Sequence, residues 1–103
     1  MKTTQFHNKN QFLIVSKKEI TFQSYESTIA VFDKENETVT LGSKWDFSLT
    51  TMKHLYLFIS EILPETNETK DLISIIQSSY VKNKREEIQK LIDNKIIGYD
   101  ESL

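Results

Sequence analysis

The chain has no cysteine, one proline, two glycines and no long apolar run, and each shortage excludes a class of protein. Without cysteine there is no disulfide framework and no thiolate-ligated metal site, which fits a reducing cytosol. So little proline and glycine argues against disordered or collagen-like structure. No apolar run approaches the roughly 20 residues of a membrane span, and residues 1–10 lack the apolar core of a signal peptide. From 103 residues of this kind we expect one cytoplasmic domain that does not enter a membrane.

Concentrated charge of one sign is also missing. The formal net charge is −2, with seven Lys against six Asp or Glu in residues 1–60 and six basic against nine acidic residues in 61–103. A nucleic-acid-binding domain usually carries a concentrated basic face, and a protein that mimics nucleic acid carries a dense acidic one. The distribution favours neither class.

The first half of the sequence contains a strand pattern. Between residues 11 and 41, apolar and β-branched residues form short runs or alternate with polar ones, and polar stretches such as residues 34–36 separate them. This predicts an antiparallel β-meander of about four strands over residues 11–41, with Val39 and Leu41 on one face. Residues 1–10, which include His7, are expected to fray.

After Gly42 the apolar residues change to helical spacing, which predicts a helix over about residues 50–63. A hydroxyl side chain before the helix can accept hydrogen bonds from its first backbone amides, so Ser48 or Thr50 is the expected N-cap. Pro64 is expected to end the helix.

Two further helices are predicted at about residues 67–81 and 84–96. Thr66 or Asn67 is the expected N-cap of the first, and Asn83, with an acidic residue three positions on, caps the second. No residue between them forbids one continuous helix, but we expect a break. The predicted fold is therefore α+β: an N-terminal antiparallel meander followed by two or three helices.

The residues that carry catalysis or bind metal are few and scattered. His7 and His54 are 47 residues apart and lack the close spacing of metal-ligand pairs. His54 is expected to be a partly exposed helix residue or to hydrogen-bond to a strand. Glu86 and Glu87 are adjacent, but neighbouring helix positions point about 100 degrees apart. No nucleophile motif or phosphate-binding glycine loop occurs. We therefore expect no enzymatic activity, no metal site and no cofactor.

The segment from Trp45 to Ser48 is the most distinctive local feature, and two interpretations compete for it. In the first, Trp45 fills the core where the sheet meets the helix, while Asp46 and Ser48 accept hydrogen bonds from backbone amides. In the second, the aromatic residues Trp45 and Phe47 are exposed and serve as a binding anchor.

Two other features indicate a binding surface. Lys82, Lys84 and Arg85 form the densest basic cluster, with Lys90 following, and cations at a helix start are unfavourable unless something else requires them. They are either an ordinary solvated helix start or a surface for contact with RNA, phosphate or an acidic protein patch. Tyr25 is expected in a turn between two strands, where its side chain is either hydrogen-bonded or an exposed anchor.

The segments SYESTIA (24–30) and TLGSKWDFSLTTMKHLYLF (40–58) resemble a family of small proteins encoded on phages, plasmids and conjugative elements of low-GC Gram-positive bacteria. Some small proteins from that genetic context are anti-CRISPR proteins that inhibit Cas9. The resemblance implies a stoichiometric inhibitor of a type II effector, whose partner is Cas9 or its complex with guide RNA. Such an inhibitor interferes with guide-RNA assembly or with a conformational step. It implies contacts through the residues Tyr25, Lys82, Lys84 and Arg85. The residues Trp45, Leu55, Phe58 and Ile59 are then expected to hold the core.

Two alternatives stay open. A mobile-element accessory or regulatory protein could bind nucleic acid through its C-terminal helices, although Glu86, Glu87 and Asp93 interrupt the basic residues of the last one. A homo-oligomeric structural protein is the third reading, and the oligomeric state is not predicted.

Overall fold

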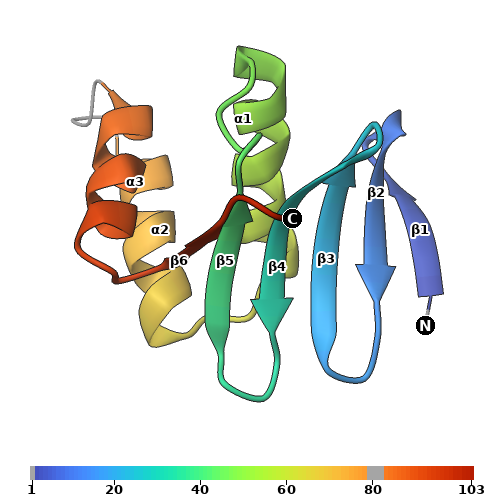
Figure 1. The fold of residues 1–103 in the computed structure, drawn as a ribbon, viewed down its shortest axis with the longest axis horizontal. Helices are drawn as coiled ribbons and strands as arrows, with labels where there is room; N and C mark the ends of the chain where they lie inside the picture. The colour runs from blue at the N-terminus through green and yellow to red at the C-terminus, as the bar shows by residue number, and fades with distance from the viewer. Residues whose placement is uncertain (1, 79–82) are drawn as a thin grey trace.

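The computed structural model describes residues 2–78 and 83–103. Within these residues, six strands form one sheet in the order β1-β2-β3-β4-β5-β6 (Figure 1). The strands are β1 (Lys2–Phe6), β2 (Asn8–Val15), β3 (Glu19–Ser24), β4 (Ser27–Asp33), β5 (Thr38–Gly42) and β6 (Gly98–Asp100). The first five pair as an antiparallel meander, and β6 joins parallel to β5.

The helical part follows the meander. Its elements in the described chain are α1 (Leu49–Leu57), the π-helix η1 (Phe58–Ile62), α2 (Asn67–Gln77) and α3 (Lys84–Asp93). In Figure 1, α1 lies behind the strands, and α2 and α3 stand at the end of the sheet formed by β5 and β6. The predicted α+β fold is confirmed. No helix in residues 2–78 or 83–103 is long and apolar enough to cross a membrane.

The core forms where the alternating apolar residues of the strands face the helices. Phe22 on β3 pairs with Leu13 on β2 and Ala30 on β4, and all three side chains are buried. The Phe22 ring stacks on Phe58 with 5.4 Å between ring centroids. Because strand side chains alternate between faces, this register puts the apolar residues of neighbouring strands on the same side of the sheet.

Residues predicted for the core are buried in it. Val39 and Leu41 are fully buried, as expected from their alternation. The side chains of Trp45, Leu55, Phe58 and Ile59 are also buried. The helical spacing of the apolar residues therefore indicated the correct face of α1.

The first predicted helix has two parts. Ser48 is its N-cap, and its Oγ accepts a hydrogen bond from Thr51 N at 3.1 Å. From Phe58 onward the helix continues as η1, in which the Ser60 hydroxyl donates to the Tyr56 carbonyl oxygen at 2.8 Å. Apolar periodicity does not separate a π turn from an α turn in so short a segment, so the change could not be predicted.

For residues 2–10, the prediction of a frayed terminus is wrong. Lys2–Phe6 form β1, an edge strand whose side chains are exposed except for that of Phe6. The polar sequence of β1 lacks an alternating pattern because most of its side chains face water. Its backbone hydrogen bonds come from β2, a partner that local sequence does not reveal.

The C-terminal boundaries also differ from the prediction. Thr66 caps α2 and Asn83 caps α3, as expected, and α2 ends at Gln77, so the predicted break between the helices is confirmed. The expected extension of α2 through residue 81 falls partly on residues 79–81, outside the described residues. The helix α3 ends at Asp93 instead of residue 96, because Lys95 adopts a left-handed conformation with φ 59. The chain then returns to the sheet as β6.

Candidate functional site

The loop between β5 and α1 is tied to two other elements. Gly42 ends β5 where a Cβ atom would lie only 2.5 Å from the Thr28 carbonyl oxygen, so the backbone passes too close for any other residue. Trp45 is only 2% exposed, which supports its predicted role in filling the core. Asp46 was expected to bind backbone amides, but its Oδ2 accepts from Arg85 Nη2 at 2.6 Å and Nε at 2.8 Å. An ion pair across 39 positions cannot be predicted from local capping rules.

The same loop turns other apolar side chains outward. Phe47 is 72% exposed and Leu49 is 83% exposed. Lys44 Nζ lies 5.2 Å from the centroid of the Phe47 ring. Because Trp45 points inward and Ser48 must cap the helix, Phe47 and Leu49 on either side of the cap face solvent. The exposed-anchor interpretation therefore applies to Phe47 and not to Trp45.

Tyr25 occupies the tight turn between β3 and β4. Its φ of 55 is in the left-handed region, and its backbone N–H donates to the Asn10 carbonyl oxygen at 2.6 Å. Gln23 Nε2 donates to the Tyr25 carbonyl oxygen at 3.0 Å. The backbone of Tyr25 is thus held by hydrogen bonds on both sides, while the residue is 63% exposed.

Tyr25 and Phe47 come together around a hollow of about 210 Å³, which we call the aromatic hollow. It lies between the β3–β4 turn and the start of α1, two segments found at the same end of the molecule (the top of Figure 1). Its lining consists of Ser24, Tyr25, Ser27, Ile29, Lys44, Phe47 and Thr51. Among these, Ser24, Ile29 and Thr51 are buried, so they form the floor, and the exposed aromatic side chains form the rim.

Two residues of the predicted basic cluster, Lys84 and Arg85, are among the described residues. The third, Lys82, lies outside them. Lys84 is half-buried at the start of α3, and Arg85 is engaged by Asp46 with its guanidinium carbon 6.0 Å from the Trp45 ring centroid. The structure connects Arg85 to the loop that carries Phe47. The structure also brings Tyr25 together with Phe47, which was not among the four residues expected to contact a partner.

The two histidines have different partners. His54 is buried and its Nδ1 lies 2.9 Å from the Thr50 carbonyl oxygen of its own helix, so the expectation of a partly exposed or strand-bound side chain is wrong. His7 Nε2 lies 2.6 Å from Glu61 Oε2 on η1. In residues 2–78 and 83–103, no group of three or more His, Cys, Asp or Glu side chains is placed to hold a metal ion.

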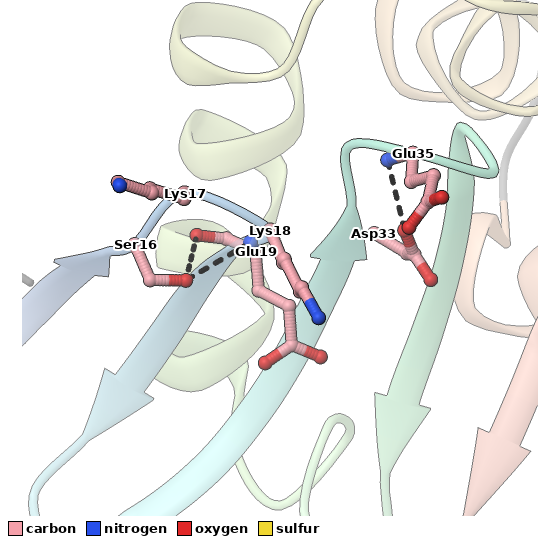
Figure 2. Close-up of a pocket in the computed structure, with 6 residues that line it drawn as sticks. All are labelled: Ser16, Lys17, Lys18, Glu19, Asp33 and Glu35. Atoms are coloured by element: carbon pink, nitrogen blue, oxygen red, sulfur yellow. Dashed lines mark hydrogen bonds between the residues drawn. The ribbon is translucent and has the colours of Figure 1, made fainter.

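Another hollow, of about 490 Å³, lies beside the β2–β3 turn and the end of β4 (Figure 2). It contains charged side chains, but their hydrogen bonds are local. Ser16 Oγ accepts from the Glu19 backbone N–H at 3.0 Å, and Asp33 Oδ1 accepts from the Glu35 N–H at 2.9 Å. Hydrogen bonds from the Asn36 backbone and side chain lower the pKa of Asp33. The Ser16 hydroxyl and the Asp33 carboxylate therefore stabilise the two turns beside this hollow.

Comparison with known proteins assigns the chain to a family. A family model described as a family of unknown function (DUF8033) matches residues 1–75, which include the whole meander, α1, η1 and the aromatic hollow. No curated protein and no solved structure matches the chain.

Proposed function

Because the chain belongs to this family of unknown function, DUF8033, its activity has to be inferred from its own surface, and we propose that it binds another protein through the aromatic hollow. The observation that carries the proposal is the exposure of Tyr25, Phe47 and Leu49 at one end of the molecule. Full burial of a Leu or Phe side chain is worth roughly 1.5–3 kcal/mol. A partner that covers these three side chains removes apolar surface from water, and the net affinity is smaller than the sum of the burial terms because association itself costs free energy.

The geometry of the rim favours tight binding. Aromatic side chains dominate the energetics of protein interfaces when they insert into a partner. Phe47 is held between the Asp46–Arg85 ion pair and the Ser48 cap, and Tyr25 stands on a hydrogen-bonded turn. Because the backbone that carries these side chains is already held in place, binding does not have to order a loop.

The partner we propose is Cas9 or its complex with guide RNA, and the activity is stoichiometric inhibition of that effector. The support is the resemblance of residues 24–30 and 40–58 to small mobile-element proteins, because these segments include both rim residues Tyr25 and Phe47. An inhibitor of this type acts in the bacterial cytoplasm and interferes with the assembly of Cas9 and guide RNA. Lys84 and Arg85 then lie at the margin of the contact, because Arg85 is anchored to the loop that presents Phe47.

Binding of nucleic acid through the C-terminal helices ranks second. Arg85 is paired with Asp46, and Lys90 Nζ lies 3.0 Å from Glu87 Oε1. These two ion pairs reduce the positive charge that α3 offers to phosphates, on which sequence-independent binding to nucleic acid depends.

The test is a DNA-cleavage assay with several type II effectors, in which the purified chain is added before or after guide RNA. Complex formation is followed by size-exclusion chromatography. We expect co-elution with at least one effector and inhibition when the chain is added before the guide. The proposal would be overturned if every effector tested cleaved DNA fully and none co-eluted with the chain. Binding to duplex DNA or to RNA alone would favour the second candidate function.

The aromatic rim is tested with matched double variants. We expect Tyr25→Ser/Phe47→Ser to abolish co-elution and inhibition while the circular dichroism spectrum and thermal midpoint stay close to those of the unmodified chain, because both side chains are exposed. The control, Lys17→Ala/Lys18→Ala, alters exposed residues at the β2–β3 turn, which lies at the other end of the sheet in Figure 1. Unchanged inhibition by the rim variant would remove the aromatic hollow from the mechanism.

A further inference from the structure

The size and walls of the aromatic hollow limit what can occupy it. Its volume of about 210 Å³ is below the roughly 300 Å³ at which pockets for drug-sized ligands begin, so one side chain fits better than a whole cofactor. Tyr25 and Phe47 stand at its rim, and Ile29 is buried in its floor. Aromatic rings favour offset or edge-to-face contact with other rings. An aromatic occupant therefore suits this hollow.

A buried side chain on the strand beside the floor residue Ser24 has an unsatisfied polar atom. Gln11 on β2 lies directly opposite Ser24 on β3, and both side chains are buried. Directly opposed residues of paired strands have neighbouring side chains, and Ser24 lines the hollow. Gln11 is 1% exposed, and its Oε1 has no hydrogen-bond partner in the described part of the chain. An occupant that carries an N–H or O–H group can satisfy this oxygen, directly or through one water.

The side chains that line the aromatic hollow carry charge of one sign. Lys44 is its only charged lining residue among the described residues, and its ammonium group lies beside the exposed Phe47 ring. The helix α1 begins at the same place and has no acidic residue in its first turn. The positive end of the helix is therefore not neutralised from within α1. A cationic occupant such as arginine is disfavoured here, and a carboxylate is favoured.

From these three observations we infer that the aromatic hollow receives a tyrosine or tryptophan side chain of a protein partner, with a carboxylate next to it. This inference rests on the proposed function and names the chemistry of the anchor. The ring lies between Tyr25 and Phe47, its polar hydrogen reaches the floor near Gln11, and the carboxylate pairs with Lys44. The aromatic ring is the part of the anchor that excludes water, and the two polar contacts give selectivity.

The first experiment uses small probes and the full chain labelled with ¹⁵N. Hydroxyphenylpropionate carries the ring, the donor and the carboxylate, phenylpropionate lacks the donor, and tyramine replaces the carboxylate by an amine. Titrations are followed at the backbone amides of Ser24 and Thr51. We expect hydroxyphenylpropionate to bind about fivefold more tightly than phenylpropionate and about two- to fivefold more tightly than tyramine, as one neutral hydrogen bond and one exposed ion pair would give. Equal affinities for the three probes, or shifts confined to other parts of the chain, would overturn the inference.

Variants separate the two polar contacts. Gln11→Met should remove the preference for hydroxyphenylpropionate over phenylpropionate, and Lys44→Glu should reverse the preference for the carboxylate over the amine. Phe47→Ala should weaken all three probes together, and a dispersed spectrum verifies that each variant is folded. If Gln11→Met and Lys44→Glu leave both preferences unchanged, the assignment of the contacts is wrong.

The result is distinguishable from that of the Cas9 assay. Probe binding needs no effector, so the expected order of affinities without Cas9 inhibition would refute the named partner and keep the anchor chemistry. Inhibition that depends on Tyr25 and Phe47, without selectivity among the probes, would refute only the anchor chemistry.

Discussion

Replacing Gln11 by methionine should make the protein more stable. Gln11 is buried on the core face of β2, and its carbonyl oxygen has no hydrogen-bond partner in the part of the chain that is described. Methionine has a similar length, bends to fill irregular space and has no strongly polar atom. Because volume-conserving substitutions usually cost little in packing, the main effect of Gln11→Met is to remove an unsatisfied acceptor.

The magnitude follows from the cost of that acceptor. A buried polar group without a partner destabilises the folded state by about 1–3 kcal/mol, so Gln11→Met should raise the free energy of unfolding by up to that amount. In a domain of this size, each kcal/mol shifts the melting temperature by about 4–8 °C. The stabilised variant should at the same time bind its partner less well, since a polar group retained in a core at a cost in stability is typical of a binding site.

Urea denaturation followed by circular dichroism measures the effect. The matched control is Gln5→Met, on the exposed edge strand β1, which should change the free energy of unfolding by less than about 0.5 kcal/mol. A loss of stability in Gln11→Met with no change in the control would refute the reasoning, because it would mean that the carboxamide already forms favourable hydrogen bonds in solution.

Two more predictions concern hydrogen bonds that stabilise the fold outside the aromatic hollow. Glu68 Oε1 accepts a hydrogen bond from the buried Val39 amide at 3.1 Å, so Glu68→Ala should lower the free energy of unfolding by about 1.5–3 kcal/mol in urea denaturation, whereas the exposed Glu65→Ala should change it little. Equal effects of the two variants would show that the bond to β5 contributes nothing. The pKa of Asp33 should lie below the ordinary 3.8 because Asn36 donates to the carboxylate, and Asn36→Ala should raise it in an NMR titration of the carboxyl carbon. Since the folded pKa is the lower one, this stabilisation is present above the unfolded pKa and is lost as pH falls through the folded pKa; an unshifted titration would contradict the assignment.

The parts of the fold that were predictable depend on neighbours in sequence. Alternation placed Val39 and Leu41 on one buried face, and helical spacing placed Leu55 and Ile59 in the core. Capping depends on a hydroxyl or amide within one helical turn, so Ser48 was among the residues predicted from the chain alone. These features are local, and local preferences agree with the folded structure here.

The parts that were missed depend on contacts between distant residues. The strand β1 is polar and forms because β2 supplies its hydrogen bonds, and β6 is three residues long and forms beside β5 only after α3 has returned the chain to the sheet. Asp46 was assigned to a cap because its ion-pair partner, Arg85, follows 39 positions later. None of these three pairings leaves a periodic signal in the sequence.

The sequence by itself therefore determined the fold class, most of the core and the presence of an unusual aromatic loop before α1. Only the tertiary structure decided which aromatic residue of that loop is available to a partner: Trp45 is buried and Phe47 is exposed. It also placed Tyr25, which is 22 positions earlier, at the same hollow. The physical reason is that a binding surface is built from segments joined by sheet pairing and helix packing, and those long-range contacts are absent from any local pattern of residues.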